Sequence, residues 1–155
     1  CNQFKKVEYM SQINVDVVAE RLDSISLCCT DLEEFRPPSI DEYLADRRYK
    51  YIIERALHLI VQAAIDINDH ILSKLSPGNS LTNFDAFIEL GKYGVISPEL
   101  AKQLAQSAGL RNRLVHEYNK LDANQVFRAI DFALQQYPIY VQQVTAYLMS
   151  LEADS

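Results

Sequence analysis

Residues 51–75 read YIIERALHLIVQAAIDINDHILSKL, and this stretch decides the fold class. Its apolar residues recur at steps of three and four, which is the spacing of one face of an α-helix. This stripe is the longest in the chain and consists of Ile53, Ala56, Leu57, Ile60, Ala64, Ile67, Ile71 and Leu75. Ser39 and Asp41 are candidate caps before it, and the run Ser76-Pro77-Gly78-Asn79 breaks it. We therefore predict one long helix between these two points.

The same spacing continues on both sides of this helix. A stripe from Val15 to Leu32 predicts a first helix, which ends at Pro37-Pro38. After the long helix, residues 83–90 predict a short helix that is stopped by Gly91 and Gly94.

Two further helices are predicted toward the end of the chain. Ser97 followed by Pro98 is typical of an N-cap with proline at the first helical position, and we expect this helix to reach about His116. Asp122, with Gln125 three residues later, resembles a capping box at the start of the last helix. That helix continues past residue 148, with a kink expected near its internal proline.

These segments predict an all-α protein, an antiparallel four-helix bundle with an additional short helix. No internal repeat or long linker divides the chain, so we expect residues 1–155 to form a single domain. Within this domain, residues 1–12 are expected to be poorly ordered or to be a remnant that does not belong to the natural protein. Long apolar stripes of this kind favour a surplus apolar face and a symmetric homodimer.

The composition is that of a globular protein outside the membrane. The chain has 155 residues, of which 48% are hydrophobic and 23% charged. No apolar run approaches the roughly 20 residues that span a bilayer, and residues 1–10 lack the pattern of a secretory signal. The three cysteines, Cys1, Cys28 and Cys29, are expected to be reduced thiols in a cytoplasmic protein. The net charge of −6 argues against a protein that coats nucleic acid, but it allows an enzyme with one local basic site.

Residues 111–118 read RNRLVHEY and hold the strongest candidate for chemistry. His116 can exchange a proton near neutral pH, so it can serve the attack of a ribose 2′-hydroxyl on the adjacent phosphate. Arg111 offers a planar fork of donors to a phosphate, and Asn112 can orient an imidazole or hold a phosphate oxygen. This class of reaction requires no metal.

Helix geometry restricts how these groups can meet. At about 100° per residue, Arg111 and His116 point about 140° apart, whereas Arg111 and Tyr118 share a face. Either the helix loosens before His116, or a second chain brings the complementary groups together. By spacing alone, a simpler interpretation also holds: the arginines are solvated, and a cation near a helix C-terminus gains about 0.3–1 kcal/mol.

Other patterns give weaker hypotheses. Glu54 with His58, and Asp66 with His70, could supply metal ligands from one helix face, but the Glu-x-x-His spacing of carboxylate-bridged metal bundles is absent, so we expect no metal site. Cys29 lies on the apolar stripe, so we expect it in the core rather than in redox chemistry. Tyrosines that alternate with basic residues could stack bases and contact phosphates, although packing at a helix start explains them equally well. These residues are Tyr43, Arg47, Arg48, Tyr49, Lys50 and Tyr51.

The string from Arg111 to Tyr118 resembles the Arg-x4-His-x-Tyr signature of the HepT toxins, within the HEPN superfamily. Residues 51–57 leading into 63–66 resemble the long second helix of that family. Residues 84–90, followed by 94–96, resemble its middle segment. The resemblance covers roughly residues 13 to 150, and the motif is intact at every position.

The resemblance implies a metal-independent endoribonuclease that works as a homodimer, with both motifs facing a shared cleft and tRNA or mRNA as the substrate. Arg111 and His116 would be the catalytic pair, with Asn112 as the polar residue after the arginine. It also implies a cognate antitoxin, a nucleotidyltransferase of the MNT type that transfers AMP from ATP to Tyr118. The ATP and Mg²⁺ would belong to that partner, so no cofactor is expected for this chain.

A second function is compatible with the same sequence. In this alternative, the chain is a non-catalytic helical-bundle module that docks and regulates a nucleotidyltransferase partner. The acidic net charge and the lack of a broad basic face support it.

Overall fold

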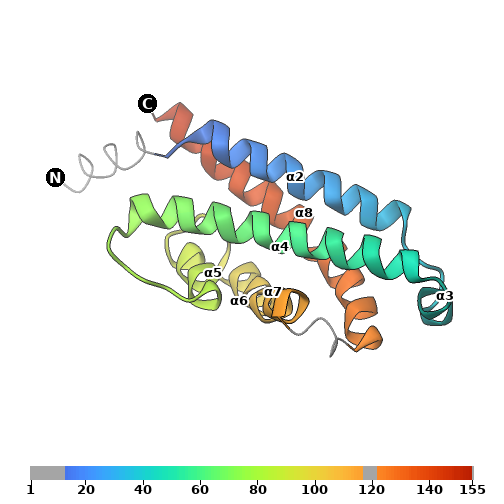
Figure 1. Ribbon diagram of the computed structural model, residues 1–155. Helices are drawn as coiled ribbons and strands as arrows, with labels where there is room; N and C mark the ends of the chain where they lie inside the picture. Colours follow the sequence, from blue (N-terminus) through green and yellow to red (C-terminus); the bar gives the residue numbers. More distant parts are fainter. Residues whose placement is uncertain (1–12, 117–121, 155) are drawn as a thin grey trace.

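Three long helices form the body of the protein. The computed structural model describes residues 13–116 and 122–154, without the side chains of Val115 and His116, so the expectation for residues 1–12 lies outside the described residues. Helix α2 (Val15–Glu34) packs against both α4 (Arg47–Leu75) and α8 (Ala123–Ala153). Figure 1 shows that α2 runs antiparallel to the other two. The antiparallel arrangement that the sequence predicts is thus observed for these three helices.

Four shorter helices complete the bundle. Helix α3 (Ile40–Ala45) lies at the beginning of α4. Helices α5 (Asn83–Lys92), α6 (Pro98–Ala105) and α7 (Ser107–His116) lie together along the side of α4 that faces away from α2 (Figure 1). Every regular element in the described ranges is a helix, which confirms the all-α bundle.

Two of the predicted helices are each divided in two. The long helix after Ser39 is interrupted at Asp46, which adopts an extended backbone and caps α4 by accepting a hydrogen bond from the Arg48 backbone at 3.0 Å. The helix after Ser97 is interrupted at Gln106, between α6 and α7. The predicted caps at Ser39, Ser97 and Asp122 are confirmed.

The predicted stop at Gly91 is wrong, whereas the stop at Gly94 is confirmed. Gly91 belongs to the last turn of α5, where its missing side chain allows α6 to approach closely. Gly94 has a φ of +76°, a conformation that glycine adopts without strain. The Val95 amide donates to Leu90 at 3.1 Å and the Gly94 amide to Gly91 at 3.2 Å, which is the Schellman arrangement at a helix end.

Helix α4 is the central element of the core. It contacts α2, α5, α7 and α8, so apolar residues are buried on more than one of its faces. Its predicted stripe is buried from Ile53 to Ile71, and Leu75 packs against the core from its edge. Helix α8 continues through Pro138. Within the described ranges, no helix combines the length and the hydropathy of a membrane span.

Candidate active site

Arg111 is held in a defined orientation by a chain of polar contacts. It is half-buried on α7, and its Nε donates to Gln62 Oε1 on α4 at 3.1 Å. Gln62 in turn donates from Nε2 to Asp66 at 2.9 Å, and Asp66 lies 3.8 Å from Arg21 on α2. Because Gln62 uses both ends of its amide, it fixes the Nε side of Arg111 and leaves N–H groups on the terminal nitrogens that can still donate to a ligand.

The other residues of the predicted motif lie at the same end of α7. Asn112 is exposed, and its Oδ1 accepts from Arg111 Nη1 at 3.4 Å. His116 is the last residue of α7, and Tyr118 lies outside the described residues. The helix continues to His116, so it does not loosen before that residue.

Two residues of α4 that the sequence analysis did not assign to this site lie near it. Arg55 Nη1 lies 3.3 Å from Nδ1 of His58, one turn further along α4. Burial lowers the pKa of His58, and the nearby guanidinium groups of Arg55 and Arg111 lower it further. The signal was present in the sequence: Arg55, His58 and Gln62 are polar residues at helical spacing beside the longest apolar stripe.

The pairs considered as metal ligands have other roles. His70 Nε2 accepts a hydrogen bond from the Asn14 backbone at 3.0 Å, and Asp66 is engaged by Gln62 and Arg21. Glu54 is buried, and burial raises the pKa of its carboxyl group. In the parts of the chain that the structure describes, no three His, Cys, Asp or Glu side chains cluster as a metal site would require.

Cys28, Cys29 and two of the three neighbouring tyrosines belong to the core. Cys28 and Cys29 are buried free thiols, and burial raises the pKa of Cys29 to about 11, which suppresses its reactivity. Tyr43 is buried and Tyr49 packs against the core, so packing accounts for both. Tyr51 remains exposed, with its hydroxyl 3.1 Å from Arg47.

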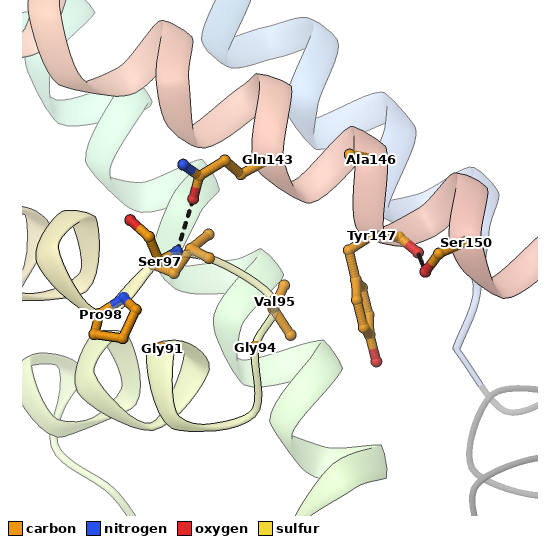
Figure 2. Close-up of a pocket in the computed structure, with 10 residues that line it drawn as sticks. Gly91, Gly94, Val95, Ser97, Pro98, Gln143, Ala146, Tyr147 and Ser150 are labelled. Carbon is orange, nitrogen blue, oxygen red and sulfur yellow. Dashed lines mark hydrogen bonds between the residues drawn. The ribbon is translucent and has the colours of Figure 1, made fainter.

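Two surface cavities differ in their relation to this site. A groove of about 450 Å³ between α2 and α4 is mainly apolar and adjoins the site through Arg55. Its lining residues are Cys28, Asp31, Phe35, Tyr51, Ile52, Arg55, Ala56 and Leu59. A cavity of about 650 Å³ lies between the α5–α6 turn and α8, where Gln143 accepts from the Ser97 backbone at 2.8 Å (Figure 2). Tyr147 is its one ionisable lining residue, so it offers little acid–base chemistry.

Comparison with known sequences identifies relatives along most of the chain. A family model described as Ribonuclease HepT-like matches residues 25–144. The chain is 57% identical over 146 residues to the tRNA nuclease HepT of Aphanizomenon flos-aquae, covering 94% of this chain and 99% of the relative. It is 22% identical over 131 residues to the mRNA nuclease HepT of Shewanella oneidensis, covering 84% of this chain and 98% of that relative.

Comparison with solved structures shows that the fold is shared. A tri-AMPylated HEPN toxin of Shewanella oneidensis, in complex with an MNT antitoxin, superposes with a TM-score of 0.76 at 22% identity, covering 86% of this chain and 99% of that chain. A toxin–antitoxin crystal structure with AMP-PNP gives a TM-score of 0.75 at 21% identity, covering 84% and 98%.

Proposed function

The chain belongs to the HepT-like ribonuclease family, and from this premise we propose that it is a toxin endoribonuclease that cuts tRNA at a site built on Arg111, Asn112 and His116. The observation that carries the proposal is the oriented, half-buried guanidinium of Arg111 in a chain so similar to a tRNA nuclease. The relative that acts on mRNA is much less similar, so tRNA is the favoured substrate. Membership of a ribonuclease family also favours an enzyme over the non-catalytic docking module.

The proposed reaction needs only protein side chains. The ribose 2′-oxygen forms a bond to the adjacent phosphorus while the bond from phosphorus to the 5′-oxygen breaks. His116 takes part in moving the proton from the 2′-hydroxyl to the departing 5′-oxygen. Arg111, held by Gln62, directs its terminal nitrogens at the phosphate and stabilises the developing charge. Asn112 adds a polar contact from the same turn. The products are a 2′,3′-cyclic phosphate and a 5′-hydroxyl.

The active form is proposed to be a homodimer. At helical spacing, Arg111 and His116 fall on different faces of α7, which supports a second copy that brings complementary groups together. The groove beside Arg55 presents exposed apolar side chains to such a copy, including Phe35 and Tyr51. Both features support a shared surface next to the proposed active site.

Regulation is proposed to act on Tyr118. The structural relatives include a tri-AMPylated toxin in complex with an MNT antitoxin, and Tyr118 occupies the acceptor position of the signature. AMP attached two residues after His116 would add bulk and negative charge to the motif that holds Arg111, which opposes the binding of an RNA phosphate. We place both partners in a prokaryotic cytoplasm. The ATP and Mg²⁺ would be bound by the nucleotidyltransferase.

Purified protein tests the proposal directly. Incubation with tRNA in the presence of EDTA should give fragments that end in a 2′,3′-cyclic phosphate. Loss of cleavage in EDTA, or fragments with a 3′-hydroxyl, would contradict the proposed chemistry.

The modification is tested separately. Protein mixed with its nucleotidyltransferase partner, ATP and Mg²⁺ should gain AMP by intact-mass spectrometry and lose its RNase activity. The Tyr118→Phe chain should remain unmodified and active. An AMP adduct of equal extent on Tyr118→Phe would show that the acceptor lies elsewhere.

A further inference from the structure

One polar edge of α4 faces α7 beside the proposed catalytic arginine. Arg55, His58 and Gln62 follow one another at steps of three and four, so they share this edge. Arg111 reaches the edge from α7 and donates to Gln62 at 3.1 Å, while Arg55 lies 3.3 Å from His58. His58 is close enough to both arginines for each to affect its pKa. Two guanidinium groups from two helices therefore flank one imidazole.

Neither of these arginines forms an ion pair with a carboxylate within the described ranges. Other basic residues, among them Arg21, Arg36, Arg48 and Lys92, do form ion pairs there. Asp66 lies on the same edge of α4, but Gln62 and Arg21 engage it. Asp31 lines the groove beside Arg55 but is beyond ion-pair distance from it. A local positive field therefore remains on a chain whose net charge is −6.

His58 can act as a hydrogen-bond donor to a ligand at this site. A guanidinium can only donate, so Nδ1 of His58 accepts from Arg55, and the neutral ring carries its proton on Nε2. The lowered pKa of His58 keeps the ring neutral at pH 7. An imidazole N–H beside two guanidinium groups matches the acceptor oxygens of a phosphodiester. The charge of that ligand would also relieve the repulsion between the two guanidinium groups.

We propose that Arg55 and His58 form a binding subsite for an RNA phosphate that neighbours the phosphate bound by Arg111. The proposal rests on the proposed ribonuclease function and extends it, because it assigns the binding of the substrate backbone to α4 rather than to the α7 motif. The subsite lies between the groove of α2 and α4 and the site on α7, so RNA would extend from Arg111 along α4.

Binding measurements test the subsite apart from catalysis. In a His116→Ala chain, which should bind RNA without cutting it, Arg55→Gln and His58→Gln should each raise the Kd for tRNA about tenfold. Arg55→Gln should also reduce the slope of log Kd against log salt concentration by about 0.7–0.9. Lys74→Gln is the matched control, because it removes one charge from the same helix about 28 Å away. Its Kd should stay within about twofold of the parent.

The possible outcomes separate the subsite from the proposed function. If the protein with His116 intact cuts RNA but the α4 variants bind like Lys74→Gln, the subsite is refuted and the ribonuclease assignment stands. If the protein with His116 intact neither binds nor cuts RNA, both the subsite and the ribonuclease assignment fail. If His58→Gln leaves the Kd unchanged and slows cleavage at saturating RNA, His58 acts in proton transfer and the binding role is overturned.

NMR titration tests the subsite without altering its residues. The chain has three histidines, so His116→Ala leaves two imidazole signals, and their assignment requires one further variant. A single-stranded RNA oligonucleotide should raise the pKa of His58 and leave that of His70 unchanged. An unchanged pKa of His58 contradicts the proposal. An equal rise with inorganic phosphate at the same concentration would show a general anion site and would also contradict it.

Discussion

Gln62 lies between two charged side chains and uses both ends of its amide. Its Oε1 accepts from Arg111 at 3.1 Å, and its Nε2 donates to Asp66 at 2.9 Å. Gln62→Leu removes both contacts while keeping a similar volume. Because Arg111 then loses its fixed orientation, kcat for RNA cleavage should fall about tenfold, with little change in the thermal midpoint. The control is Gln103→Leu at an exposed position of α6. Equal rates for the two variants would show that Gln62 does not position Arg111.

The residues of the site differ in how far the sequence could predict them. Arg111 and Asn112 were predicted because their chemistry lies within one short motif. Gln62, which orients Arg111, is 49 residues away in the chain. Helical periodicity places a residue on a face of its own helix, but it does not give the register between two helices. That register brings His58 near Arg111, and Arg55 contacts His58 from the preceding turn.

Glu54 predicts how stability depends on pH. It is 8% exposed, and burial raises the pKa of its carboxyl group, partly offset by Lys50. The folded state therefore holds this proton more tightly than the unfolded state. As pH rises from the ordinary value of 4.5 through the raised value, Glu54 should lower the free energy of unfolding, and the penalty then stays constant. Urea unfolding across this pH range should show that the free energy of unfolding declines less in Glu54→Gln than in the unsubstituted protein. Parallel curves for the two proteins would contradict this prediction.

At the scale of elements, the contact between α5 and α6 depends on Gly91. A Cβ at this position would lie 2.7 Å from the Cβ of Ala101, which is too close for either helix to stay in place. Gly91→Ala should therefore cost about 1–3 kcal/mol of stability. At Gly109, in α7, an added Cβ meets nothing closer than 3.7 Å, so Gly109→Ala should be neutral or stabilise by about 0.5–1 kcal/mol. Thermal unfolding checks both. Equal effects of the two substitutions would contradict the close approach of α5 and α6.

The elements show where local rules sufficed and where they did not. The apolar stripes gave the existence of every long helix, and the caps at Ser39 and Ser97 gave two starting points. Neither proline nor glycine stands at or next to Gln106 to predict this break, and the apolar residues on both sides continue the helical spacing. Packing in the whole bundle therefore decided it, overriding the local preference. The prediction for Gly91 was wrong because a glycine inside a helix can allow close packing of another helix rather than end its own helix.

At the scale of the whole molecule, the regular course of α7 predicts a site shared by two subunits. Arg111→Ala and His116→Ala should each be inactive alone. Where the paired groups come from different subunits, a heterodimer of the two variants contains one intact site. Mixing equal amounts under conditions that exchange subunits should restore about a quarter of the normal activity, because half of the dimers are mixed and each has one of two sites. No recovery in a mixture shown to contain heterodimers would place both groups within one subunit.

The most direct test of the central claim, that residues 111–116 cut RNA, is the single-turnover rate of tRNA cleavage by the purified chain and by Arg111→Ala and His116→Ala. Each substitution should reduce the rate by about 100-fold or more, while both variants keep the helical content and the thermal midpoint of the parent. Cleavage at equal rates by all three proteins would contradict the claim and would assign the activity to other residues.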